Sequence, residues 1–502
     1  MSRSILLRLL ALLAALAVVG AACGGDDGAD DAEPPGDTSA DDGGDTGDTA
    51  TDDGDGDGDE AGDDGSDAGD EAAAVDPALC PVGALDGASG PVEIDLWHAM
   101  SANLQASLDE LVAAYNASQD AVVVNSLFQG SYNENLDKYL AGLRGGDRPT
   151  LVQLEETALQ LGVDAGSFVP MEACIVAADY PVDEFVPGVV EAYQLDGVLW
   201  PMPFNVSNPI LYANAAVLED AGVTELPTTL DELRTASQAI VDSGAAESGL
   251  SLTASPWVIE QLFALADEPI TDNANGREGR ASEMLIDTEL GLEVFTWLDA
   301  MVADGLATYV GLGANQEQFF ALATGVAGMT IDTTAALTGV LDAAAGLDPP
   351  VPVQAGPMPS ATGERPGSVL VGGAALWLDA ESSDEERAAA WDFLTWLNDA
   401  EQQATWHAGT GYLPITTAAT DLPAVQELWE AQPAYRVAFD QLTGSGDPVA
   451  GPVIGNHAQV REDAIVPALE RMYLQGQDPA AALSQAESEA NAIIEDYTGR
   501  VS

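Results

Sequence analysis

The sequence has little positive charge. Of its 502 residues, 14 are lysine or arginine and 84 are aspartate or glutamate, and Lys138 is the only lysine. Nucleic acid binds to basic surfaces because its backbone is a chain of phosphates, so this balance excludes it as a partner. The negative charge is typical of an exterior adapted for solubility and does not bear on the fold.

Histidine is also scarce, and the three present do not fall in a catalytic motif. His98 follows a predicted strand, His407 precedes a glycine-rich corner and His457 precedes the C-terminal helical region. The chain has no HExxH, GxSxG, Walker or dinucleotide-binding glycine pattern. We interpret the histidines as structural and expect no catalytic site, cofactor or metal. The competing hypothesis to a protein without catalytic activity is a secreted enzyme that hydrolyses phosphodiesters. Such an enzyme would need a metal cluster or an activated nucleophile.

Cysteine occurs three times, and the first lies at the end of a secretion signal. Two arginines, an apolar run from Ile5 to Val19 and a few small residues precede Cys23, a pattern typical of a signal peptide. The small residues resemble a bacterial lipobox, in which the cysteine is lipidated, although Gly20 stands where leucine is usual. We expect residues 1–23 to be a lipoprotein signal peptide; an ordinary signal peptide is the alternative.

The other two cysteines, Cys80 and Cys174, are expected outside the cytoplasm. There, a pair most often forms a disulfide, which here would join the start of the folded part to a loop after the third strand. Two buried thiols are the alternative. No second hydrophobic span follows the N-terminal one, so we expect an extracytoplasmic protein anchored to the cell membrane through Cys23.

An acidic segment follows the signal. Residues 24–71 hold 21 acidic and no basic residues among Gly, Thr and Ala, and cannot bury enough apolar surface to fold. We expect residues 24–75 to be a disordered tether. Residues 53–58 alternate Asp and Gly as calcium loops do, but Asp64 stands where the twelfth-position Glu belongs and no helices flank it, so we favour a solvated spacer.

Beyond the tether, strand and helix patterns alternate. Strand patterns at 92–97, 122–124 and 150–154 are separated by helix patterns that begin at Ser101 and Ser131. This order predicts a parallel sheet covered by helices, with ligands outside the carboxyl ends of its strands.

A second unit with the same kind of alternation begins after residue 205. The patterns predict strands at 209–212, 326–331 and 369–378, helices at 229–240, 288–305, 315–324 and from Ser383, a connection rich in Gly and Pro at 345–367, and a mostly helical tail from Ala458. Two such units joined by several crossings predict two lobes around a cleft, a preferred place for small-molecule sites.

One corner stands out between these units. In the stretch 406–414, two glycines and a proline bracket Tyr412. Glycine and proline let a chain turn sharply, so we predict a crossing between lobes that presents the Tyr412 hydroxyl to the cleft. We interpret the neighbouring His407 as a packing residue.

Six groups of motifs occur in the order seen in one family. They are Leu96 to Met100, Gly130 to Tyr132, Pro203 to Asn205 with Leu211-Tyr212, Gly372-Gly373 with Leu376-Trp377, Trp406 to Pro414, and Gly455-Asn456 with Gln459 to Arg461. Together they resemble the solute-binding proteins of ABC importers, and particularly the subgroup similar to the sn-glycerol-3-phosphate-binding subunit. The resemblance covers most of residues 90–497.

The resemblance implies an α/β, two-lobed periplasmic-binding-protein type II fold with the ligand in the interlobe cleft. The lobes are expected at 76–205 plus 352–408 and at 206–351 plus 409–502. The implied function is capture of sn-glycerol-3-phosphate or a glycerophosphodiester by lobe closure and delivery to a membrane permease, by a monomer that is not an enzyme. Alternatives are a sugar- or oligosaccharide-binding protein and a chemosensory or adhesive surface protein of this fold.

The resemblance also implies a set of ligand-binding residues. Carried over by position, they are Tyr132, Glu156, Ser207, Trp257, Thr333, Gly373, Tyr412 and Arg461. Arginine can offer a planar fork to two phosphate oxygens, a carboxylate can accept from hydroxyl groups, and a glycine amide can be approached closely. A second tryptophan that partners Trp257 in the family is missing, which leaves the exact ligand open.

Other interpretations are open for the roles of several of these residues. Glu156 follows Glu155, and either could simply be solvated. Tyr132 could pack in the core, and Thr334 is a rival to Thr333. Arg461 could instead pair with Glu462 or Asp463 on the surface of a helix.

Overall fold

The computed structural model describes residues 75–186, 188–313, 316–363, 365–444 and 451–501. The signal peptide, Cys23 and nearly all of the tether lie outside these residues, so what we expect of them stays a prediction. The chain divides into two units, residues 1–71 and 72–502, and the second contains every element described below. Within the described ranges, no helix combines the length and the apolar character needed to cross a membrane.

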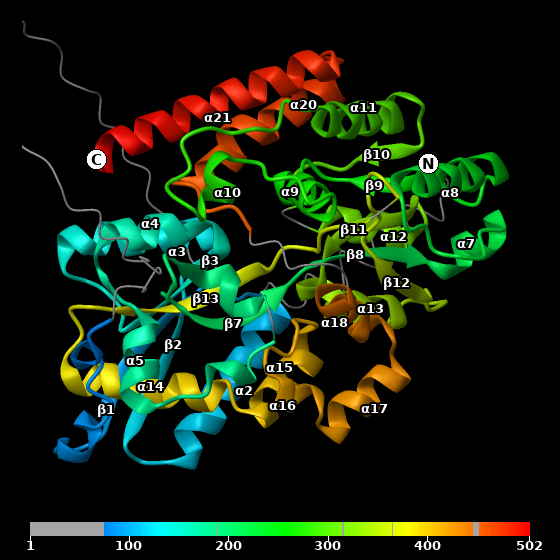
Figure 1. Ribbon diagram of the computed structural model, residues 1–502. Coiled ribbons are helices and arrows are strands. Elements are labelled where there is room, and N and C mark those ends of the chain that lie inside the picture. The colour runs from blue at the N-terminus through cyan, green and yellow to red at the C-terminus, as the bar shows by residue number, and fades with distance from the viewer. Residues whose placement is uncertain (1–74, 187, 314–315, 364, 445–450, 502) are drawn as a thin grey trace, which may run out of the picture. The chain divides into compact units, whose positions relative to one another are not determined.

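The first sheet has six strands and contains the predicted parallel core (Figure 1). Its order is β2-β1-β3-β13-β4, and β7 also pairs with β13. β1 is parallel to β2 and β3, as predicted, whereas β13 is antiparallel to β3, β4 and β7. The strands are β1 (Val92–His98), β2 (Val122–Phe128), β3 (Leu151–Glu155), β4 (Phe168–Val169), β7 (Met202–Ser207) and β13 (Gly372–Asp379).

The helices of this sheet begin where the sequence predicts them. In α3 (Tyr132–Gly145), the Ser131 side chain accepts from the backbone of Glu134, whose carboxylate accepts from the backbone of Ser131. The same capping box, with Ser383 and Glu386, starts α14 (Asp384–Leu397). Such boxes satisfy N–H groups that have no partner inside the helix. They fix the point at which the chain leaves the strands and enters the helices.

The second sheet has five strands in the order β10-β9-β11-β8-β12. β9 is parallel to β10 and β11, and β8 is antiparallel to β11 and β12. The strands are β8 (Pro209–Asn214), β9 (Ser248–Leu252), β10 (Ala307–Tyr309), β11 (Ala327–Thr333) and β12 (Val353–Pro357). The expectation that 345–367 is only a connection is wrong, because β12 pairs with β8. The expected lobe boundary at 352 is therefore too early; the remaining boundaries stay predictions.

At one of the crossings between the two sheets, the connection is a single buried residue. β7 of the first sheet leads through Asn208 directly into β8 of the second. The Asn208 amide donates to the Ala438 carbonyl at 2.9 Å and accepts from Gln441 Nε2 at 2.7 Å, and its backbone carbonyl accepts from Thr334 N at 3.1 Å. These bonds satisfy the polar groups of a buried crossing strand.

The remaining helices and short segments cover the sheets and connect them (Figure 1). α21 (Pro479–Val501) packs on α11 (Glu289–Ala303), α20 (Val466–Gln475) and η6 (Val460–Ile465), and α18 (Ala434–Gly444) packs on β8 and β12. The remaining elements follow in chain order. They are η1 (Pro77–Leu79), η2 (Ala84–Gly87), α2 (Ala102–Ser118), η3 (Glu156–Ala158), α4 (Leu159–Ala165), α5 (Met171–Ala178), η4 (Val182–Glu184), α6 (Val189–Tyr193), the hairpin β5 (Gln194–Leu195) and β6 (Val198–Leu199), α7 (Ala215–Ala221), α8 (Leu230–Ser243), α9 (Pro256–Leu265), α10 (Asp272–Gly276), α12 (Glu317–Thr324), η5 (Thr334–Ala336), α13 (Leu337–Ala345), α15 (Ala400–Thr410), α16 (Thr417–Thr420), α17 (Pro423–Ala431) and α19 (His457–Gln459).

A disulfide bond joins Cys80 to Cys174, the pairing expected from the sequence. Cys80 follows η1, and both cysteines are fully buried. Cys174 lies inside helix α5 and not in a loop, which corrects that part of the expectation. The bond ties the segment after η1 to helix α5 across 94 residues of sequence.

Removing this bond should lower stability. We expect the double variant Cys80→Ala, Cys174→Ala to lose about 2–4 kcal/mol of unfolding free energy, because a cross-link over a long loop restricts the unfolded chain. Urea unfolding of the variant and of the wild type, each with and without reductant, measures this. The reduced wild type should match the variant, and equal midpoints for oxidised and reduced wild type would contradict the prediction.

Candidate functional site

The candidate site is assembled from three segments that are far apart in sequence. Strand β3 ends at Glu155 and leads into Glu156, α9 carries Glu260, and η6 carries Arg461. η6 is a π-helical turn that ends two residues before Pro467, which has no N–H to donate into the helical ladder. Such turns disturb the regular spacing of side chains and often occur at functional sites.

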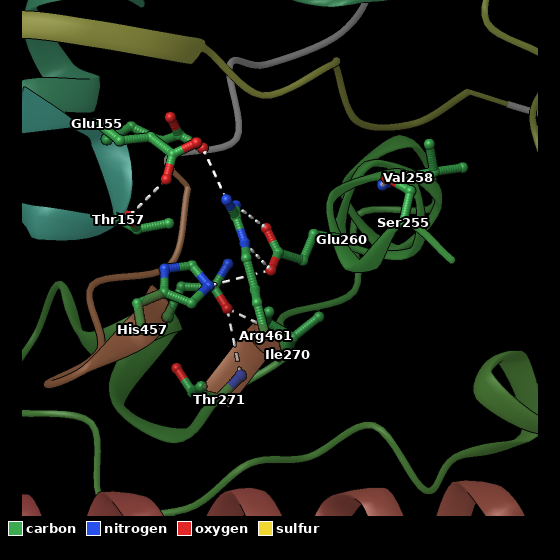
Figure 2. Close-up of polar contacts among 11 residues, drawn as sticks. Glu155, Thr157, Ser255, Val258, Glu260, Ile270, Thr271, His457 and Arg461 are labelled. Atoms are coloured by element: carbon green, nitrogen blue, oxygen red, sulfur yellow. Dashed lines mark hydrogen bonds and ion pairs between the residues drawn. The ribbon is translucent and has the colours of Figure 1, made fainter. Parts of the chain in front are cut away.

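Arg461 is held between two carboxylates, as Figure 2 shows for Glu260. Its Nε donates to Glu260 Oε1 at 2.8 Å, and its Nη2 donates to Glu260 Oε2 at 2.5 Å. Its Nη1 donates to Glu156 Oε1 at 3.1 Å. The Arg461 side chain is only 12% exposed. The alternative pairing with Glu462 or Asp463 is therefore wrong, because the arginine reaches across to α9 and η3.

The guanidinium keeps unused donors. It carries five N–H groups, and the three bonds to Glu260 and Glu156 use one on Nε, one on Nη2 and one on Nη1. Among the described residues, one N–H on each Nη nitrogen has no partner. Arg461 can therefore still offer a two-pronged contact while Glu260 fixes the plane of the group.

Glu260 stays ionised because it is paired on both sides. Burial works to raise its pKa, but Arg461 and His457 outweigh burial and lower the pKa to about 2. His457 Nε2 lies 3.0 Å from Glu260 Oε1, and burial lowers the pKa of this histidine. His457 thus braces the carboxylate that positions Arg461.

Glu156 is the less satisfied carboxylate. Burial, together with the nearby charges of Glu155 and Glu260, raises its pKa to about 8 despite the opposing effect of Arg461. Its second oxygen, Oε2, is buried and has no hydrogen-bond partner among the described residues. A ligand hydroxyl or a proton would satisfy that oxygen.

A cavity of about 730 Å³ opens beside Arg461. Within the described part of the chain, Arg461 is the one basic residue among those that line it, against four acidic ones. The polar residues that line the cavity lie on segments next to both sheets. They are Ser131, Tyr132, Asn133, Glu155, Thr253, Ser255, Gln318, Asp332, Arg461, Glu462 and Asp463. Trp257 lines this cavity and also a small enclosed space of about 20 Å³ that Glu156 faces.

Tyr132 and Tyr412 belong to one chain of hydrogen bonds. Gln153 Nε2 donates to Asn205 Oδ1 at 2.8 Å, and Asn205 Nδ2 donates to the Tyr132 hydroxyl at 2.9 Å. The Tyr132 and Tyr412 hydroxyls lie 3.5 Å apart. Tyr132 both packs against the hydrophobic core and lines the cavity, whereas Tyr412 is only 3% exposed.

Trp257 covers the part of the first sheet that holds two more predicted site residues. Ser207 pairs with Gly372 between β7 and β13, and a Cβ on Gly372 would lie 2.6 Å from the Trp257 ring. Gly373 has φ +99°, and a Cβ there would lie 2.0 Å from the Asn205 carbonyl oxygen. Both glycines are required by close approach, the first of a side chain and the second of the backbone.

Thr333 and its rival Thr334 have different surroundings. The Thr333 hydroxyl accepts from Ala335 N at 3.1 Å at the end of β11 and is partly exposed. Thr334 is fully buried and accepts from Asn208 N at 3.4 Å. Thr333 is thus the more accessible of the two, and neither lines the large cavity.

The corner after α15 is built around a neutral histidine. Trp429 Nε1 donates to His407 Nε2 at 2.9 Å, so the proton lies on Nδ1, which donates to the Tyr412 carbonyl at 2.6 Å. Burial lowers the pKa of His407 to about 4. Gly411 ends α15 with φ +97°, and Tyr412 stacks on Trp406 with ring centroids 5.5 Å apart. His407 is thus a packing residue, and its hydrogen bond to the Tyr412 carbonyl fixes the backbone at that point.

The structure brings together part of the predicted set. Tyr132, Trp257 and Arg461 line the large cavity, and Glu156 joins them through its bond to Arg461. The others, Ser207, Thr333, Gly373 and Tyr412, do not line it. Glu260 was not predicted, because an isolated acid in an apolar helix carries no motif. Within the described ranges, no group of three or more His, Cys, Asp or Glu residues could hold a metal ion.

Comparison with known proteins identifies relatives over most of the chain. Residues 110–434 match a family model described as bacterial extracellular solute-binding protein. The sn-glycerol-3-phosphate-binding periplasmic protein UgpB of Rhizobium meliloti (strain 1021) is 29% identical over 416 residues, which cover 81% of this chain and 95% of the relative. The protein of the same name from Agrobacterium fabrum is 28% identical over 417 residues, with 81% and 93% covered.

Solved structures share the fold. The crystal structure of UgpB from Mycobacterium tuberculosis in complex with glycerophosphocholine has a TM-score of 0.69 at 21% identity and covers 82% of this chain and 99% of its own. The GacH receptor of Streptomyces glaucescens, solved unliganded and with acarbose, has a TM-score of 0.69 at 17% identity, with 81% and 99% covered. At these identities the likeness shows the two-lobed α/β fold and nothing finer.

Removing Glu260 should destabilise the protein. Glu260→Ala leaves Arg461 buried with one partner, and breaking a buried pair in this way costs about 3–5 kcal/mol. Because the pKa of Glu260 is depressed to about 2, its contribution is present above the unfolded value of about 4.5 and is lost as the pH falls towards 2.

The measurement is urea unfolding at pH 7 and pH 3. The matched control is Glu268→Ala, an exposed acid just beyond the same helix. We expect a large loss for Glu260→Ala at pH 7, a smaller one at pH 3, and almost none for the control. An equal loss at both pH values would contradict the pairing.

Proposed function

The chain belongs to the family of bacterial extracellular solute-binding proteins, and from that premise we propose that it captures sn-glycerol-3-phosphate or a glycerophosphodiester. As a family member it is a substrate-binding protein of an ABC importer that acts outside the cytoplasm. The two lobes would close on the ligand and present it to a membrane permease. Anchoring through a lipidated Cys23 is part of the same proposal.

The position of Arg461 carries the proposal. It is the one basic lining residue of the cavity within the described chain, and two of its N–H groups are unused. A phosphate offers paired oxygens that match two N–H donors. The relatives named for sn-glycerol-3-phosphate binding and the solved complex with glycerophosphocholine support the same ligand class.

The glycerol part has partners as well. The Oε2 of Glu156, which has no partner among the described residues, can hydrogen-bond to a ligand hydroxyl, and the Tyr132 hydroxyl, which accepts from Asn205 and lies 3.5 Å from the Tyr412 hydroxyl, lines the cavity. Trp257 offers an apolar ring beside the same cavity. A small polyol phosphate would therefore find a cation, two hydrogen-bond partners and one apolar wall.

A sugar is the second candidate, and one observation favours it. Arg461 is already ion-paired with Glu260 and hydrogen-bonded to Glu156, and the cavity lining combines four acids with one tryptophan. Carboxylates accept from sugar hydroxyls and tryptophan packs on the apolar face of a sugar ring. Several solved structures of this fold were determined with sugars, among them acarbose. Direct binding experiments separate the two candidates.

Calorimetry should show binding of a glycerol phosphate and not of maltose. With sn-glycerol-3-phosphate or glycerophosphocholine as titrant, Arg461→Ala should weaken binding at least about 30-fold, because truncating one member of a buried charge pair costs about 2 kcal/mol or more. The matched control is Arg234→Ala, an arginine that pairs with Asp304 and does not line the cavity. Heat with maltose alone, or affinity unchanged in Arg461→Ala, would overturn the proposal.

Binding should also take up a proton. A phosphate placed at Arg461 lies near Glu156, which already faces Glu155 and Glu260, and further raises its pKa above about 8. Glu156 is then protonated in the complex at a pH where the free protein is losing the proton, so affinity falls by up to about fivefold from pH 8 to pH 9.

Titrations of glycerophosphocholine between pH 6 and pH 9 test this, because the charge of a phosphodiester is constant over that range. Glu156→Gln should abolish the decline. Heats measured in two buffers of different ionisation enthalpy should show proton uptake for the wild type at pH 8. A flat profile for the wild type would contradict the role given to Glu156.

A further inference from the structure

The large cavity has a second polar region apart from Arg461. Asp332 lies near the end of strand β11, and Gln318 lies in the first turn of α12. Both line the cavity that Arg461 lines. Neither residue belongs to the ligand set carried over from the family resemblance, so their arrangement has to be explained from the contacts alone.

The two side chains are fixed by one short hydrogen bond. Gln318 Nε2 donates to Asp332 Oδ2 at 2.6 Å, and Asp332 Oδ1 accepts from Thr333 N, also at 2.6 Å. The bond to the carboxylate settles which end of the amide is oxygen, since the reverse orientation would set two oxygens against each other. The amide oxygen is therefore turned away from Asp332.

That oxygen has no partner. Gln318 is only 4% exposed, and its Oε1 is buried without a hydrogen bond within the described part of the chain. An acceptor left unpaired in a buried place is costly, so natural structures seldom keep one without a reason. The carboxylate beside it also has no arginine, lysine or histidine partner among the described ion pairs, and burial raises the pKa of Asp332 to about 6.

The region therefore contains one acceptor that lacks a donor, Gln318 Oε1, and a carboxylate that lacks a cation. A hydroxyl group has a single hydrogen to give and carries no charge. A quaternary ammonium has the charge but no N–H. A primary ammonium has both, because its three N–H groups can reach a carboxylate and an amide oxygen together.

We propose that Asp332 and Gln318 form a second subsite of the cavity, which receives a primary ammonium group at the far end of the ligand. The inference rests on the proposed function: the phosphate lies at Arg461 and the ammonium is borne by the other substituent of the phosphodiester. The preferred class is then a glycerophosphodiester with an aminoethyl group. A cavity of about 730 Å³ is of the size that holds drug-sized ligands, and so has room for a substituent beyond glycerol phosphate.

The first test varies the ligand and leaves the protein unchanged. Calorimetry at pH 8, where Asp332 is ionised, compares glycerophosphoethanolamine with its N-methyl, N,N-dimethyl and choline analogues. Each methyl group removes one N–H while the charge stays, so affinity should fall along the series, with at least a tenfold difference between its ends. Equal affinity along the series, or tightest binding of the choline compound, would overturn the subsite.

The second test removes the acceptors. Asp332→Asn and Gln318→Leu should each reduce the preference for ethanolamine over choline to less than about threefold, with the affinity for the choline compound little changed. The matched control is Asp463→Asn, a carboxylate that lines the same cavity and accepts from Gln459. It should keep the full preference.

The outcomes separate the two proposals. A preference that survives both Asp332→Asn and Gln318→Leu would overturn the subsite alone. Binding of every diester with the same affinity would do the same and leave the proposed function standing. No heat with any phosphodiester or with sn-glycerol-3-phosphate would overturn the proposed function and the subsite together.

Discussion

The buried guanidinium of Arg461 is the constraint on which the rest of the site depends. A charge of this kind is tolerated in a protein interior only when it is paired and its hydrogen bonds are made. Here the partners come from η3 and α9, and a third residue, His457, secures one of them. The ion pairs thus require three distant segments to meet at one point. Because Arg461 lines the cavity, the point where these segments meet also forms part of the cavity wall.

The chain has few arginines, and two of them, Arg277 and Arg280, join segments that are far apart in sequence. Arg280 forms two hydrogen bonds, at 2.6 and 2.7 Å, with Asp164 of α4, and that carboxylate also accepts from Tyr497 of α21. Arg277 donates to backbone carbonyls at Glu191, Ala192, Gln194 and Gly451, and burial lowers its pKa to about 10. In a chain with six acids for every base, these contacts join α10 and the residues after it to the helices of the first sheet.

Local patterns in the sequence predicted much of the fold and less of the site. The capping boxes at Ser131 and Ser383 are confirmed because they depend on residues three apart. Strand β12 was missed because Val353–Pro357 contains Gly and Pro and becomes a strand only by pairing with β8. The Glu260–Arg461 pair spans 201 residues, and no local rule indicates it. By contrast, Glu462 and Asp463 follow Arg461 directly in the sequence, but residues one or two positions apart on a helix do not face each other.

Trp257 links the large cavity to the first sheet. Its ring lies against Gly372, over the strands that hold Ser207 and Gly373, while Tyr412 is buried behind Tyr132. A ligand that touches Arg461 can enter the large cavity as it stands. A ligand that also touches Gly372 requires the tryptophan to leave that residue. Because Trp257 and Glu260 share helix α9, such a movement shifts the partner of Arg461 as well. The residue that covers Gly372 and the residue that pairs with Arg461 are therefore carried by one helix.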